Sequence, residues 1–241
     1  AAAHRSGIRG LRMSSRQFGP RLTRAGAQFR LWAPAANRVD VLLEKPHALT
    51  RGENGWFTAE IAGIKPGTHY RFRIDDEIDV PDPASDFQPE DVFGPSEVID
   101  HAAYAWQAKD WRGRPWQEAV IAEAHVGTFT AQGTYRAMID RLDHLVETGI
   151  TVLELMPLAD FAGSRNWGYD GVLWYAPDSA YGRPEDLKAL IDEAHLRRQA
   201  EELLRRIEVG LAEGETLRAL RAVEVLEHAG GAEARRLLTT L

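Results

Sequence analysis

The stretch Glu123-Ala124-His125-Val126-Gly127-Thr128 opens the part of the chain that decides the fold, and it predicts a short strand. Apolar residues at helical spacing follow it, and Gly149 stands where a left-handed helix C-cap belongs. The next apolar stretch, Val152-Leu153-Glu154-Leu155-Met156-Pro157, predicts a second strand. A strand, a crossover helix and a second strand of this length predict a βαβ unit with parallel strands.

A long loop rich in aromatic and carboxylate side chains follows the second strand. It runs from Ala159 to Gly182 and holds Asn166-Trp167-Gly168-Tyr169-Asp170-Gly171. In parallel α/β folds the loops after the strands open on the carboxyl face, where ligands bind. We therefore expect the Thr128–Thr134 loop and the Asn166–Asp170 loop to be neighbours around one mouth.

Four motifs in this region carry a family resemblance. They are His125-Val126-Gly127-Thr128-Phe129-Thr130, Glu154-Leu155-Met156-Pro157-Leu158, Asn166-Trp167-Gly168-Tyr169-Asp170-Gly171-Val172 and Ala176-Pro177-Asp178-Ser179-Ala180-Tyr181-Gly182. They resemble the maltooligosyltrehalose trehalohydrolases of the α-amylase clan of glycoside hydrolases, over about residues 18–195. The resemblance implies hydrolysis of the α-1,4 bond that joins trehalose to a maltooligosaccharide, in trehalose biosynthesis and without an organic cofactor.

The same resemblance points to sugar-binding residues in the second loop. Tyr169 resembles the clan tyrosine that stacks on the sugar ring, and Asp170 resembles the neighbour that reaches a hydroxyl group. An aromatic face against C–H groups, with a carboxylate on hydroxyls, suits glucose recognition. The candidate substrate-binding residues are therefore Trp167, Tyr169, Asp170 and His125. In the alternative interpretation, Trp167 and Tyr169 pack the loop onto the barrel and His125 fixes the neighbouring strand by hydrogen bonds.

Catalytic carboxylates are not expected in this chain. Retaining glycoside hydrolysis needs two carboxyl groups about 5–5.5 Å apart, and in this clan they come from later barrel strands that the motif positions leave out. Glu154 lies inside the second strand, where a structural role is expected. Nothing in the spacing of Asp160 and Asp170 sets one pKa high and the other low. We predict no catalytic and no metal-binding residues, and no hydrolysis by this chain alone.

The chain divides into four predicted segments. Residues 1–24 carry six arginines and no acidic residue and are expected to form a disordered basic extension. Period-two alternation and turn signals over 25–103 predict an immunoglobulin-like β-sandwich, related by the resemblance to glucan-binding domains. Residues 104–195 are expected to form the first βαβα portion of a (β/α)8 TIM barrel, and 196–241 an all-α tail.

Two features of the predicted sandwich allow a functional interpretation. Trp32 and Trp56 suit sugar-stacking platforms, but a tryptophan in a small sandwich is more often core, which is what we expect. The acidic run from Asp75 to Asp79 lacks the spacing of a calcium loop and is expected to be a solvated hairpin tip.

The amino-acid composition argues against several classes of binding partner. A formal charge of −7 argues against a general nucleic-acid binder, and the lack of cysteine excludes disulfides and thiolate metal sites. No apolar run approaches the ~20 residues that span a bilayer. We expect a cytoplasmic protein with an α-glucan or maltooligosaccharide ligand, no cofactor, no membrane partner and an open oligomeric state. The alternatives are a non-catalytic α-glucan-binding module, or a chimeric gene product whose helical tail binds a protein.

Overall fold

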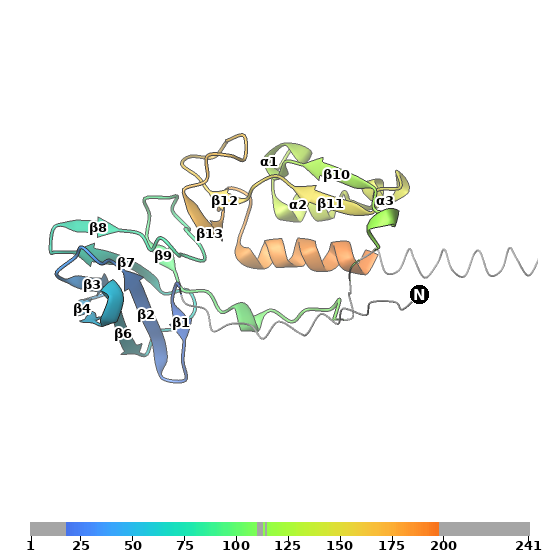
Figure 1. Ribbon diagram of the computed structural model, residues 1–241. Coiled ribbons are helices and arrows are strands. Elements are labelled where there is room, and N and C mark those ends of the chain that lie inside the picture. Colours follow the sequence, from blue (N-terminus) through green and yellow to red (C-terminus); the bar gives the residue numbers. More distant parts are fainter. Residues whose placement is uncertain (1–17, 110–112, 114, 198–241) are drawn as a thin grey trace, which may run out of the picture. The chain divides into compact units, whose positions relative to one another are not determined.

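A computed structural model describes residues 18–109, 113 and 115–197 of the protein (Figure 1). Among them, residues up to Asp192 belong to one compact unit, and those from Glu193 on belong to a second. The predicted tail therefore lies outside the described residues from residue 198 on, and the predicted basic extension up to residue 17.

The first part of the chain forms two antiparallel sheets, as the period-two pattern predicts. One sheet has the order β1 (Arg21–Leu22), β2 (Gly26–Trp32), β6 (Trp56–Ala62) and β5 (Thr50–Arg51). The other has the order β4 (Pro46–Ala48), β3 (Val39–Leu42), β7 (His69–Ile74) and β8 (Ile78–Val80), and β9 (Ser96–Glu97) also pairs with β7. The strand at Arg21–Leu22 means that the sandwich begins inside the segment predicted as an extension.

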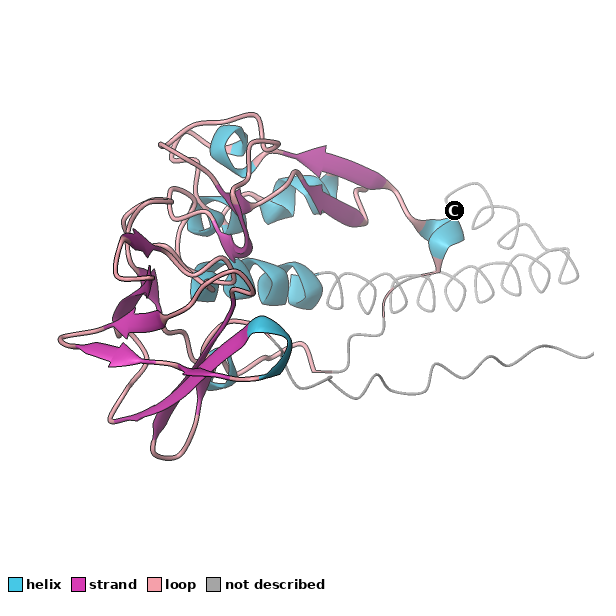
Figure 2. Ribbon diagram, turned by 60° about the vertical axis from the view of Figure 1, so that its left-hand side comes forward, coloured by secondary structure: helices cyan, strands magenta, loops and turns pink. Residues whose placement is uncertain are grey.

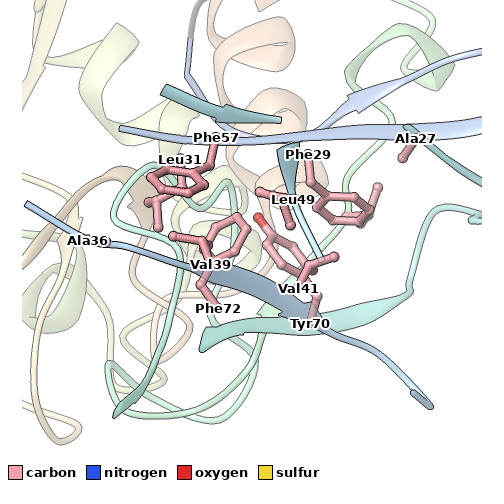
Figure 3. Packing of buried hydrophobic residues seen from close by; sticks show 11 residues of the cluster. Ala27, Phe29, Leu31, Ala36, Val39, Val41, Leu49, Phe57, Tyr70 and Phe72 are labelled. Atoms are coloured by element: carbon pink, nitrogen blue, oxygen red, sulfur yellow. The ribbon is translucent and has the colours of Figure 1, made fainter. Parts of the chain in front are cut away.

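The sandwich core lies between the two sheets. Phe29, Leu31 and Phe57 of the first sheet point toward Val41 and Phe72 of the second, as Figure 3 shows. All five are at most 7% exposed. Each fully buried side chain of this size contributes about 2 kcal/mol through removal of apolar surface from water. The alternation of the strands and this burial confirm the predicted β-sandwich.

The two tryptophans of the first sheet are not core residues, contrary to the prediction. Trp32 is 57% exposed and Trp56 is half-buried. They face each other across β2 and β6 on the side of the sheet opposite to Phe29, Leu31 and Phe57. Successive side chains of a strand point to opposite faces, so Trp32 cannot share the face of Leu31.

The acidic run forms the tip of the β7–β8 hairpin, as predicted. Asp75 (φ 52°) and Asp76 (φ 61°) both have positive φ, as the two central residues of a type I′ turn do, and the Glu77 N–H donates to the Ile74 carbonyl oxygen at 3.0 Å. The Asp75 carboxylate also accepts hydrogen bonds from the backbone N–H groups of Asn37 (2.7 Å) and Arg38 (2.8 Å). The tip therefore ties two loops of the sandwich together.

The proline-dense segment at residues 81–95, between β8 and β9, is largely buried. The Tyr70 hydroxyl donates to Asp82 (2.8 Å), and Ser96 donates to Gln88 (2.6 Å). Further along the chain, Arg183 donates to the buried carboxylate of Glu97 at 2.5 Å. This segment therefore joins the sandwich to the residues that follow, through polar groups whose hydrogen bonds are satisfied.

The predicted βαβ unit is present, with β10 (Ile121–Ala124) and β11 (Val152–Leu155) parallel and side by side (Figure 1). The connection holds α1 (Val126–Phe129), α2 (Tyr135–Ile139) and α3 (Leu142–Glu147). The predicted strand over 123–128 is thus wrong after Ala124, where the chain turns into α1. Gly149 has φ 82°, which confirms the left-handed C-cap.

The remaining described residues contain a short hairpin and a helix. β12 (Ala159–Asp160) and β13 (Leu173–Pro177) pair antiparallel inside the segment predicted as a loop. Residues 184–197 are helical, and short 3-10 turns occur at η1 (Glu53–Gly55), η2 (His101–Ala103) and η3 (Trp116–Glu118). Figure 2 shows strands in magenta and helices in cyan. Within the described part, no helix is long and apolar enough to cross a membrane.

Candidate functional site

The segment Asn166–Asp170, called the site loop below, lies at the carboxyl ends of the two parallel strands. His125 directly follows β10, and its Nε2 lies 2.9 Å from the Asn166 carbonyl oxygen. A Cβ placed on Gly168 would lie 3.4 Å from Met156, the first residue after β11. The loop is therefore anchored to both strand ends, which is where the βαβ topology predicts a binding site.

The two aromatic side chains of the site loop project into solvent. Gly168 between them is buried with φ 94°, and its N–H donates to the Asn166 side-chain oxygen. This anchored turn leaves Trp167 82% exposed and Tyr169 70% exposed. The alternative interpretation, in which these rings pack the loop onto the barrel, is not what the structure has.

Asp170 adds an exposed carboxylate to the site loop. It is exposed, and within the described residues its carboxylate has no hydrogen-bond or ion-pair partner. Nor do the rings of Trp167 and Tyr169 make a ring contact there. Together the three side chains offer two apolar faces for C–H groups and one acceptor for hydroxyl groups.

His125 anchors the site loop through a hydrogen bond to the loop backbone. A 2.9 Å contact between Nε2 and a carbonyl oxygen requires the proton on Nε2. The imidazole also meets the ring of Tyr181 edge-on, with ring centroids 5.9 Å apart. The structure thus gives His125 a hydrogen-bonding role, but its partner is the site loop and not the neighbouring strand of the alternative interpretation. Tyr181, which sequence reasoning assigned no role, holds the imidazole; it lies in the Ala176–Gly182 motif that carried the family resemblance.

A carboxyl pair that the sequence did not predict lies in the β12–β13 hairpin. Asp160 is 0% and Asp178 1% exposed. Asp178 accepts hydrogen bonds from the backbone N–H groups of Phe161 (3.0 Å) and Ala180 (2.7 Å). Neither carboxyl oxygen of Asp160 meets a donor among the described residues. The predicted carboxylates Asp160 and Asp170 are thus separated in role, one buried and one exposed.

Burial controls the protonation of this pair. Loss of solvent, and then the charge of Asp178, raise the pKa of Asp160 to about 7. Burial also raises the pKa of Asp178, against the two backbone hydrogen bonds that favour its charged form. A glycosidic bond cannot reach groups that are this buried, so the pair is structural.

The remaining acidic residues near the strands do not form a site. Glu154 is exposed on β11 and lies opposite Glu123 of β10, and within the described residues its carboxylate has no hydrogen-bond or ion-pair partner. In that same part of the chain, no group of three or more His, Asp or Glu side chains is arranged to hold a metal ion.

Comparisons with known proteins identify relatives of this chain by sequence. Residues 17–86 match the model of carbohydrate-binding module 48, the isoamylase N-terminal domain. The chain is 45% identical over 172 residues to a malto-oligosyltrehalose trehalohydrolase of Deinococcus radiodurans, covering 71% of this chain and 28% of the relative. It is 39% identical over 180 residues to one of Saccharolobus solfataricus, covering 74% of this chain and 32% of the relative.

Comparison with solved structures also identifies similar proteins. A Salmonella typhimurium crystal structure assigned to the alpha amylases matches with a TM-score of 0.75 and 47% identity, covering 77% of this chain and 32% of that one. A pullulanase from Paenibacillus barengoltzii complexed with maltotetraose, 21% identical, shares the fold with a TM-score of 0.66 over 76% of this chain and 36% of that one. The chain spans less than a third of the length of the curated relatives named above. By these similarities, 71–74% of the chain resembles part of the malto-oligosyltrehalose trehalohydrolases, and residues 17–86 match carbohydrate-binding module 48.

Proposed function

We propose that this chain binds α-glucan chains, in particular maltooligosaccharides, through the site loop, as part of a glycoside hydrolase of trehalose biosynthesis. In that reaction the α-1,4 bond next to the trehalose unit is hydrolysed. The observation that carries the proposal is the pair of exposed rings at Trp167 (82%) and Tyr169 (70%) on a loop anchored to two strand ends. Apolar surface of this size, left in water on an ordered loop, marks a binding site.

The geometry of the loop suits a sugar ring. Anchoring by His125 and Gly168 fixes the backbone on both sides of Trp167, so little conformational freedom is lost when a ligand binds. A glucose ring has apolar C–H faces and an equatorial rim of hydroxyl groups. The Tyr169 ring stacks on a C–H face of the sugar, and the carboxylate of Asp170 accepts hydrogen bonds from the hydroxyl groups.

We also propose that this chain does not cleave the glycosidic bond by itself. Catalysis needs two carboxyl groups that flank the bond and reach it from solvent. The two carboxyl groups that come together here, Asp160 and Asp178, are 0% and 1% exposed. This burial supports the second candidate function, a non-catalytic α-glucan-binding module, and so does the carbohydrate-binding module at residues 17–86.

Calorimetric titration of the full chain with maltoheptaose tests the binding proposal. Tyr169→Ala is expected to weaken binding about tenfold, since one aromatic contact is worth about 1.4 kcal/mol. Trp116→Ala is the matched control, because Trp116 is also highly exposed (76%) but lies in η3, outside the site loop. Equal affinity of wild type and Tyr169→Ala, or no heat at millimolar ligand, would refute the proposal.

A further inference from the structure

The site loop is part of the β12–β13 hairpin, which closes at a neck formed by residues 158–161 and 172–178. β12 and β13 pair across this neck, and the site loop lies between its two sides (Figure 1). At the mouth of the neck, the Val172 N–H donates to the Asp160 carbonyl oxygen at 2.7 Å. A movement of the neck would therefore also move the site loop.

The side chains of Asp160 and Asp178 meet inside this neck, one from each side. Asp178 accepts hydrogen bonds from the backbone N–H groups of Phe161 (3.0 Å) and Ala180 (2.7 Å). Asp160 is fully buried, and neither of its carboxyl oxygens meets a donor among the described residues. A buried carboxyl group without a donor is satisfied when it carries a proton and donates that proton to a neighbouring acceptor. Asp178 is the acceptor within reach.

The groups around the pair supply no counter-charge. Asp91, from the segment at residues 81–95, is a further carboxylate and raises the pKa of both groups. Tyr181 and Tyr135 face Asp178. Burial, and then the charge of Asp178, raise the pKa of each tyrosine, so both hydroxyls are neutral near pH 7. If the pair lost its proton, two negative charges would meet in the neck without a cation among these groups.

We propose that Asp160 and Asp178 are positioning residues for the site loop. A proton shared between their carboxyl groups holds the neck closed, and release of this proton to solvent loosens the neck and weakens α-glucan binding. Neither residue touches the ligand, because both are buried. This inference rests on the proposed function, since it concerns how the same loop is held.

The direction and size of the effect follow from the protonation of Asp160. Burial, and then the charge of Asp178, raise its pKa to about 7, so the proton is present below this pH and is lost above it. Since the closed neck is the binding-competent form, its population and the apparent affinity both fall about tenfold from pH 6 to pH 8. By reciprocity, ligand binding takes up protons near pH 7.

Calorimetric titration of the full chain with maltoheptaose at pH 6, 7 and 8 tests the proposal. Wild type is expected to bind about tenfold more weakly at pH 8 than at pH 6. Asp160→Asn is expected to bind equally at both, because its amide donates to Asp178 at every pH. Asp40→Asn is the matched control and should follow wild type, since Asp40 is also buried (2% exposed) but lies in β3.

His125 is a second titratable group that holds the site loop. It is present in wild type and in both variants, so a pH dependence that Asp160→Asn removes belongs to the carboxyl pair. Wild-type titrations at pH 7 in two buffers with different heats of ionisation measure the proton uptake directly. This measurement needs no variant, and it decides the question if Asp160→Asn does not fold.

Hydrogen exchange of the Gly168 N–H reports on the loop without a ligand. This group donates to the side chain of Asn166 within the site loop. Its protection, corrected for the intrinsic pH dependence of exchange, is expected to fall about tenfold from pH 6 to pH 8 in wild type. In Asp160→Asn the protection should stay constant.

The outcomes separate the two proposals. A pH dependence of binding and of protection that Asp160→Asn removes and Asp40→Asn retains supports the positioning role. The same pH dependence in wild type and Asp160→Asn, or no proton uptake on binding, overturns this role and leaves the proposed function standing. No binding by wild type at any pH overturns the proposed function. The exchange of Gly168 then still decides whether the carboxyl pair holds the loop.

Discussion

At the scale of single residues, environment decides what each carboxylate does. Asp170 and Asp160 are ten positions apart, yet one faces water and the other is 0% exposed. The sequence placed both near the strand ends, but it could not show that Asp160 meets Asp178. That contact depends on the pairing of β12 with β13, and a strand of two residues such as β12 carries no readable alternation.

The buried pair gives a pH dependence with a definite sign. Burial and Asp178 raise the pKa of Asp160 from 3.8 to about 7. Between these values the unfolded chain is ionised at Asp160 and the folded chain holds the proton. The contribution of Asp160 to stability is therefore present at low pH and is lost as pH rises through about 7.

Asp160→Asn is expected to remove this dependence, because an amide cannot ionise and can donate to Asp178. Thermal unfolding should show the variant close to wild type near pH 4, and more stable than wild type by a few kcal/mol at pH 8. Asp170→Asn, at an exposed position, is the control and should follow wild type at both values. A wild type that gains stability over Asp160→Asn with rising pH would contradict the assigned direction.

For Trp32, the strand alternation in the sequence already indicated the correct face, but a general residue preference was given more weight. Phe29 and Leu31 define the core face of β2, so the alternation alone places Trp32 on the other face. The general preference of tryptophan for burial led to the wrong expectation. For His125 a hydrogen-bonding role was expected as an alternative, but the observed partner is Asn166 of the site loop and not a neighbouring strand.

At the scale of elements, the βαβ unit could be predicted from the sequence. The early end of its first strand and the interruption of its helix could not. Val126 and Thr128 favour a strand, but the backbone N–H groups of Thr128 and Phe129 both donate to the His125 carbonyl and close a helical turn. The predicted single helix is also interrupted, because Asp140 and Arg141 separate α2 from α3.

Two glycines at positive φ provide a matched test of these close contacts. Gly133 (φ 65°) would place a Cβ 2.9 Å from the Gly127 carbonyl oxygen, whereas Gly149 (φ 82°) has nothing within 4 Å. Gly149→Ala should cost about 1 kcal/mol, the strain of the left-handed conformation. Gly133→Ala should cost about 2–3 kcal/mol, because backbone must also move.

Urea unfolding of both variants measures the difference. Gly133→Ala is also expected to weaken maltoheptaose binding, since Gly127 lies against His125 and Tyr181, which hold the site loop. Equal destabilisation of the two variants would mean that the approach of Gly133 to Gly127 is not as close as described.

At the scale of the whole molecule, the sequence predicted the order of the parts well. The sandwich core and the parallel pair β10–β11 both follow from hydrophobic periodicity. The buried polar junction could not be predicted, because Glu97 and Arg183 are far apart in the chain and meet only in the fold. The pairing of Trp32 with Trp56 across the first sheet was likewise hidden until the register of β2 with β6 was known.

The central claim is that this molecule presents an α-glucan-binding surface without accessible catalytic carboxyl groups. The most direct measurement is the release of free trehalose from maltotriosyltrehalose by the purified full chain, followed by chromatography against a buffer blank. We predict no release above the blank, from wild type and from Asp160→Asn alike. Release of trehalose by the wild-type chain, lost in Asp160→Asn, would contradict the account, because it would make the buried pair catalytic.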